Sequence, residues 1–111
     1  MSHEPPSDPP RTAPRLKTAL PIRLPDGWSG EVLNLSTTGL RLRSIAMLPI
    51  GTPVDAVIEH PNREVALKAI VIWADPPQYD IDVAGEIGLA LQEVSQDYLD
   101  LLVELFADSE R

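Results

Sequence analysis

Hydrophobic positions alternate with polar ones in six short stretches of the chain beyond its first 15 residues. In 39–44, leucines alternate with Arg41 and Arg43, which is the two-residue period of a strand with one buried and one wet face. Turn-forming Pro, Gly, Asn and Ser residues separate the stretches. We therefore predict six strands, at 18–24, 30–35, 39–44, 54–60, 64–73 and 86–94.

The period changes to that of a helix at the C-terminal end. Ser95 is a suitable N-cap, and Asp97 lies favourably in the first turn. An apolar stripe at helical spacing predicts a docking face, formed by Tyr98, Leu101, Leu102, Leu105 and Phe106. Six strands and one helix predict an all-β fold with one C-terminal helix. We expect a small six-stranded antiparallel β-barrel, with the helix packed on it or covering one end.

Length and composition divide the chain into an arm, one domain and a short tail. The 111 residues suffice for one small core. Residues 1–15 hold five of the twelve prolines and no aliphatic side chain except Ala13, so they cannot bury enough apolar surface to fold. We predict a flexible Pro-rich arm at 1–15, a barrel domain with its helix at 16–106, and a tail at 107–111.

The charge is uneven along the chain. The net charge is −8, with +4 in residues 11–43 and −10 in residues 44–111. This balance argues against DNA or RNA as a partner, whereas the basic segment can attract a small anion. The chain has no cysteine, no apolar run that could insert into a membrane and no signal-peptide pattern, so we expect a cytoplasmic protein.

Residues for catalysis or metal binding do not form a recognisable set. His3 and His60 lie in the arm and at a turn, with no nucleophile or metal-ligand spacing around them. We therefore predict no catalytic residues, no metal site and no enzyme activity.

Two short motifs remain as candidates for function. Arg11 and Arg15 form R-x-x-x-R directly before the first strand, and Asn34, Ser36 and Gly39 form N-x-S-x-x-G between two strands. The second motif has two explanations. Its side chains can make the local hydrogen bonds of a turn, with the glycine serving the bend, or they can hold a ligand.

Together the motifs resemble those of the PilZ domain family, whose pattern is R-x-x-x-R followed by [D/N]-x-S-x-x-G. The step P-x-G-x-P-V at 49–54, the last strand with I-G-L-A-L and the closing helix are also similar to that family. The resemblance covers residues 11 to about 106. It implies a PilZ-like barrel that binds cyclic di-GMP, with no other cofactor, through Arg11, Arg15, Asn34, Ser36 and Gly39.

The ligand's chemistry suits these residue types. Arginine forks grip phosphate oxygens or read guanine O6 and N7, and a flat guanidinium stacks on a base. Two departures from the family pattern matter. Pro10 stands where many members have a further arginine, which favours one ligand molecule per domain, and Asn34 stands where many have Asp, which lowers the expected affinity. Trp73 can stack on a base if it faces the hairpin, but we expect it in the core.

The predicted function is that of a cyclic di-GMP receptor that changes its surface on binding and regulates an unidentified protein partner. Motility and exopolysaccharide production are the usual outputs of the family that it resembles. The alternative is a ligand-independent adaptor that uses the acidic loop 74–85 and the helix as its interaction surface.

Overall fold

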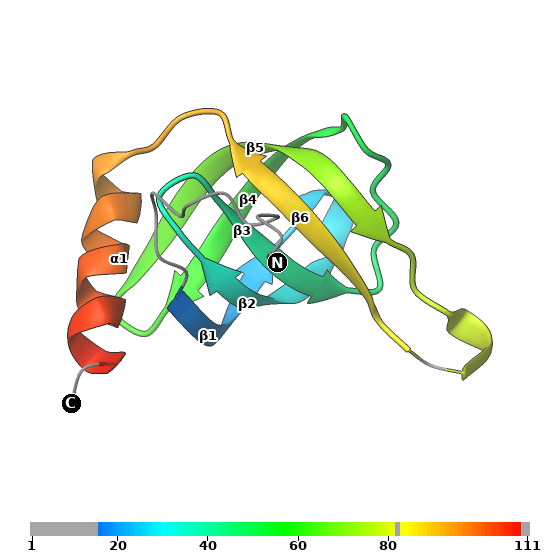
Figure 1. Cartoon of the computed structure of the whole chain (residues 1–111), viewed down its shortest axis with the longest axis horizontal. Coiled ribbons are helices and arrows are strands. Elements are labelled where there is room, and N and C mark those ends of the chain that lie inside the picture. Colours follow the sequence, from blue (N-terminus) through cyan, green and yellow to red (C-terminus); the bar gives the residue numbers. More distant parts are fainter. Residues whose placement is uncertain (1–15, 82, 110–111) are drawn as a thin grey trace, which may run out of the picture.

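The computed structural model describes residues 16–81 and 83–109. Its six strands form a closed antiparallel barrel in the order β1-β2-β3-β6-β5-β4 (Figure 1). The strands are β1 (Leu16–Arg23), β2 (Ser29–Leu35), β3 (Gly39–Ser44), β4 (Pro53–His60), β5 (Arg63–Asp75) and β6 (Gly85–Leu91). One helix, α1 (Gln96–Ser109), and two short 3-10 turns, η1 (Pro25–Gly27) and η2 (Tyr79–Ile81), complete the fold. The predicted all-β fold with a C-terminal helix is therefore confirmed.

Some element boundaries differ from the prediction. β5 continues to Asp75, because that residue still pairs with Glu86 of β6. β6 ends at Leu91 rather than at 94, and the exposed residues after it lead into the helix. α1 extends to Ser109, so the first part of the predicted tail is helical. The predicted arm at 1–15 lies outside the described residues.

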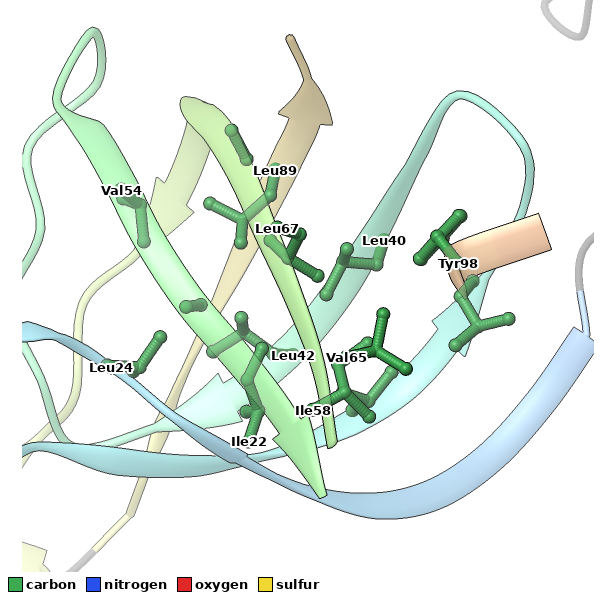
Figure 2. Packing of buried hydrophobic residues seen from close by; sticks show 14 of the residues in the cluster. Ile22, Leu24, Leu40, Leu42, Val54, Ile58, Val65, Leu67, Leu89 and Tyr98 are labelled. Atoms are coloured by element: carbon green, nitrogen blue, oxygen red, sulfur yellow. The ribbon is translucent and has the colours of Figure 1, made fainter. Parts of the chain in front are cut away.

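The barrel interior holds one hydrophobic core, shown in Figure 2. Alternate residues of each strand point inward, as the two-residue period requires. Burying one Leu, Ile or Val side chain contributes ~1.5–3 kcal/mol. The largest buried side chains are Tyr98, Ile22, Leu35, Leu42, Ile58, Leu89 and Leu101.

Helix α1 packs against one end of the barrel (Figure 1). The Tyr98 N–H donates to Ser95 Oγ at 3.1 Å, which confirms Ser95 as the N-cap. The apolar stripe faces the core, where Tyr98, Leu101 and Leu102 are buried. On the polar side, Arg63 Nη2 of β5 lies 2.7 Å from Glu104 Oε2. The predicted docking face of the helix is confirmed.

Pro21 lies in β1 at an unpaired flank. β1 pairs with β4 only at Ile22 and Arg23 and with β2 over most of its length. A proline donates no backbone hydrogen bond, so it fits a strand that is partly free on one side. Within the described ranges, no helix has the length and hydropathy needed to cross a bilayer.

Candidate ligand-binding site

The 36–39 turn between β2 and β3 is held by its own side chains and backbone. The Ser36 N–H donates to the Gly39 carbonyl at 2.9 Å, and the Thr38 N–H donates to Ser36 Oγ at 3.3 Å. Ser36 is buried, and its hydroxyl also donates to the Gly39 carbonyl at 3.4 Å. The Ser36 side chain therefore makes turn hydrogen bonds, as one of the two explanations of the motif expected.

The rest of the fold holds this turn in place. The Tyr98 hydroxyl of α1 donates to the Ser36 carbonyl at 2.7 Å, and the Leu91 N–H of β6 donates to the Thr38 carbonyl at 3.0 Å. The hairpin is therefore fixed from the helix and from the neighbouring strand. A rigid hairpin of this kind can present the side chains beside it at constant positions.

Gly39 is required by a close approach of two strands. A Cβ at this position would meet the Leu89 carbonyl oxygen of β6 and clash with it. Gly39 pairs in register with Ala90, and its backbone does not adopt a positive φ. Gly39 is therefore required by the packing of β3 against β6, and the positive φ that a bend could demand is not found there.

One row of residues crosses five neighbouring strands on the outer face of the barrel. Lys17 of β1 is in register with Asn34 of β2, and Asn34 is in register with Arg41 of β3. Arg41 is in register with Gly88 of β6, and Gly88 with Trp73 of β5. The row therefore aligns two cations, an amide and an indole on one surface.

Two β-bulges bring Asn34 and Trp73 to this outer face. The register of β2 against β3 shifts between Val32 and Asn34, and that of β5 against β6 shifts between Val71 and Trp73. A bulge adds one residue to a strand, which turns the following side chain to the other face. Trp73 is 37% exposed, so the expectation that it lies in the core was wrong.

Trp73 lies flat against β6 at a glycine. A Cβ at Gly88 would come within 2.7 Å of two indole carbons of Trp73 and closer still to its nitrogen. Arg41 Cζ lies 5.7 Å from the centroid of the indole. A guanidinium at this distance makes a cation–π contact with the ring. The backbone at Gly88, the indole and the Arg41 side chain thus form a compact cluster.

These residues line a groove of about 340 Å³. Its walls come from β2, β3, β5 and β6, and it is lined by Asn34, Thr38, Gly39, Leu40, Arg41, Ile72, Trp73, Gly88, Leu89 and Ala90. Small-molecule sites are typically clefts of this order of size, with a few placed polar groups in a partly apolar wall. The groove offers an amide, a cation and an aromatic ring to a ligand.

Charged side chains of both signs lie around the groove. Glu86 Oε1 accepts a hydrogen bond from Arg41 Nε at 2.7 Å, and Arg43 Nη1 lies 3.5 Å from Glu31 Oε1. Both arginines are about half exposed, so neither is buried as a structural ion. Among residues 16–81 and 83–109, no group of three or more His, Cys, Asp and Glu side chains could hold a metal ion.

The structure brings some of the predicted site residues together. Asn34 and Gly39 line the groove, whereas Ser36 is buried in the turn behind it. Arg11 and Arg15 lie outside the described residues. Leu16, the next residue after Arg15, is in register with Leu35 and therefore begins β1 beside the motif strand.

Sequence reasoning missed the contributions of Arg41 and Gly88 to the groove. The alternation in 39–44 places Arg41 only on the wet face of its strand, and Gly88 enters only as part of the family-like last strand. The alternation around Arg41 does show that it points outward, but only the register across β3, β6 and β5 shows that it meets Trp73.

Comparison with protein families and with solved structures identifies the family of this chain. The family model for the PilZ domain matches residues 9–108. A search of curated proteins found no match. The structure is similar to that of the Bacillus subtilis inhibitor of motility MotI/DgrA, with a TM-score of 0.73, 16% identity, and coverage of 89% of this chain and 51% of that chain.

Two further similar structures contain cyclic di-GMP. The K. pneumonia MrkH complex has a TM-score of 0.72, 16% identity, and coverage of 91% of this chain and 54% of that chain. The Escherichia coli YcgR PilZ domain has a TM-score of 0.66, 13% identity, and coverage of 88% of this chain and 90% of that chain. The chain thus spans about half the length of MotI/DgrA and MrkH. At such identities the likeness shows the fold, while the family match spans nearly all of the sequence: the chain belongs to the PilZ domain family.

Proposed function

We propose that this protein is a cyclic di-GMP receptor whose ligand binds in the groove beside the β2–β3 hairpin. The observation that carries the proposal is the alignment of Asn34, Arg41 and Trp73 on one surface, beside the strand that follows the R-x-x-x-R motif. The cyclic di-GMP in the similar MrkH and YcgR structures supports the choice of ligand.

Each groove residue has a chemical counterpart in the ligand. The ligand presents two phosphates and two guanines on a compact ring. The amide of Asn34 can pair with a guanine edge, the indole of Trp73 can stack on a base, and Arg41 can grip a phosphate or guanine O6 and N7. Arg11 and Arg15 supply the remaining cations in this proposal, and their forks close over the phosphates.

The volume of the groove supports a site that is completed by residues from outside it. About 340 Å³ is at the low end of the size range for small-molecule sites. β1 begins at Leu16, next to Lys17 that pairs with Asn34, and Arg15 directly precedes Leu16 in the sequence. Pro10 at the start of the motif favours one ligand molecule per domain.

The test is isothermal titration of the parent protein and its arginine variants with cyclic di-GMP. Arg15→Ala should weaken binding by about one to two decades, since a lost charge-assisted contact costs ~1.5–3 kcal/mol. Arg11→Ala should cost somewhat less, because more of the chain must be ordered to place it. The matched control is Arg23→Ala, which removes an exposed arginine paired with Glu59 and outside the groove.

These titrations distinguish a ligand-binding role of the R-x-x-x-R motif from the absence of such a role. The receptor proposal fails if the parent does not bind cyclic di-GMP, or if Arg15→Ala binds as tightly as the parent. If Arg23→Ala loses as much affinity as Arg15→Ala, the loss reflects only the change in net charge and not a contact with the ligand. None of these variants should lower the melting temperature by more than a few degrees.

The proposal also includes a protein partner, and an exposed apolar surface supports it. Ile45, Met47 and Ile50 are more than half exposed, and Tyr79 donates from its hydroxyl to the Ile45 carbonyl at 2.8 Å. This surface lies at the end of the barrel from which η2 protrudes, away from α1 (Figure 1). Asp80 follows Tyr79 in η2, and its charge would suit a partner segment with apolar and basic side chains.

This surface also favours the second candidate, a ligand-independent adaptor. Ile50→Asp tests the surface, because Ile50 is 66% exposed and outside the groove of Asn34 and Trp73. If the protein is a receptor, both Arg15→Ala and Ile50→Asp abolish regulation of the partner in cells. An adaptor loses it only in Ile50→Asp.

A further inference from the structure

Glu86 is an acidic residue at the edge of a groove proposed to bind an anion. It lies on β6, two residues before Gly88 and on the same outer face, in register with Arg43 and Asp75. Its side chain is 27% exposed, and its contact with Arg41 lies at the solvent-exposed surface. Neither sequence motif accounts for it.

The carboxylate of Glu86 engages the one described arginine that lines the groove. Glu86 Oε1 accepts from Arg41 Nε at 2.7 Å and from Arg41 Nη2 at 2.5 Å. The same guanidinium lies over the indole of Trp73, with Cζ 5.7 Å from the ring centroid. Arg41 is therefore held by a carboxylate at its edge and by an aromatic ring at its face.

A bound nucleotide would need the groups that this cluster occupies. An acceptor that binds Arg41 bidentately through its Nε–Nη2 edge needs the two donors that point at Glu86. A base that stacks on the same face of Trp73 competes with Arg41, whose Cζ lies 5.7 Å from the ring centroid. In addition, a carboxylate at the edge of the groove repels phosphates at short range.

We propose that Glu86 sets the affinity of the groove by holding Arg41 against Trp73 until the ligand displaces it. The inference rests on the proposed function and goes beyond it, because it assigns a role to a residue outside both motifs. Binding exchanges the carboxylate partner of Arg41 for a ligand acceptor and frees the indole for a base. Glu86 thereby lowers affinity and favours ligands that carry both an anionic acceptor and a stacking base.

The direction in which Glu86→Gln changes the affinity for cyclic di-GMP distinguishes this role from its opposite. If Glu86 instead positioned Arg41 for the ligand, Glu86→Gln would weaken binding. Under the proposal, Glu86→Gln binds cyclic di-GMP about three- to tenfold more tightly, because an exposed ion pair is lost and a repulsive charge is removed. The gain should shrink at high salt, since exposed charges are screened.

The matched control is Glu59→Gln. Glu59 also accepts from an arginine, with Arg23 Nε 2.9 Å from its Oε2, but it lies on β4 and does not line the groove. Both substitutions remove one negative charge and one arginine pair. Glu59→Gln should leave affinity within about twofold of the parent, because its charge is partly exposed, lies outside the groove and is screened by salt.

A double-mutant cycle tests whether Glu86 changes the affinity through Arg41. In an Arg41→Ala background, Glu86→Gln should gain less than about twofold, because residues that act as a unit are non-additive. A full gain in that background would show that only the charge of Glu86 matters, and the holding role of Glu86 would be refuted.

The fluorescence of Trp73 provides a readout that does not depend on ligand. In a Trp28→Phe background Trp73 is the sole tryptophan. Release of Arg41 in ligand-free Glu86→Gln should expose the indole to water and shift its emission to longer wavelength. An unchanged spectrum would overturn the claim that Glu86 holds Arg41 on the ring.

The titrations also separate failure of the inference from failure of the proposed function. If the parent binds and Glu86→Gln binds equally or more weakly, the inference is overturned and the receptor function stands. If the parent does not bind, both are overturned.

Discussion

Substitution of Gly88 by alanine should abolish the stacking surface of the groove while leaving the barrel folded. The added Cβ would lie within 2.7 Å of two carbons of the Trp73 indole. Carbon–carbon contacts become favourable at about 3.5–4.0 Å, so the ring has to retreat by roughly 1 Å or more. The indole is partly exposed and can turn outward into solvent.

The expected costs to stability and to binding differ in size. Overpacking costs ~1–3 kcal/mol in a closed core, and the low end of that range applies here because the displaced ring can leave. For a domain of this size, ~1 kcal/mol corresponds to a fall of about 4–8 °C in melting temperature. Loss of one base–aromatic stack costs ~1–3 kcal/mol, which weakens cyclic di-GMP binding about 5- to 150-fold.

Isothermal titration and thermal unfolding on the same samples measure both quantities. Trp73→Ala is the companion variant, since it removes the ring itself. If Gly88 acts only through the indole, Gly88→Ala has no further effect on affinity in the Trp73→Ala background. Binding of Gly88→Ala within twofold of the parent would refute the reasoning, and so would fully additive losses in the double variant.

Three further substitutions test how the hairpin and the helix are held. Tyr98→Phe should lower the free energy of unfolding by ~1–2 kcal/mol in a denaturant titration, because the buried hydroxyl donates to the Ser36 carbonyl at 2.7 Å; no loss would show that the carbonyl finds another donor. Ser36→Ala should cost ~1 kcal/mol of stability through the lost Thr38 N–H bond, with little effect on affinity. An unchanged melting temperature with tenfold weaker binding would instead make Ser36 a ligand contact. Ser95→Ala should destabilise the protein by ~1 kcal/mol through loss of the N-cap. Amide hydrogen-exchange rates in α1 equal to those of the parent would contradict this.

The sequence by itself determined the elements and their order. The two-residue period, the turn residues and the switch to a helical stripe are local signals, because they reflect the geometry of a single strand or helix. They located the β2–β3 hairpin, the Ser95 cap and the buried face of α1, and each of these is confirmed. The turn bonds of Ser36 were also foreseeable, since they join residues two and three positions apart.

Only the tertiary structure decided which residues share the groove. Strict alternation from Val65 through Val71 carries Trp73 into the core, but the bulge after Val71 turns it outward. Such a register shift depends on how β5 pairs with β6, and no local pattern in one strand reveals it. The contact between Arg41 and Glu86 likewise joins residues 45 positions apart, which meet because the strand order of the barrel places β3 beside β6.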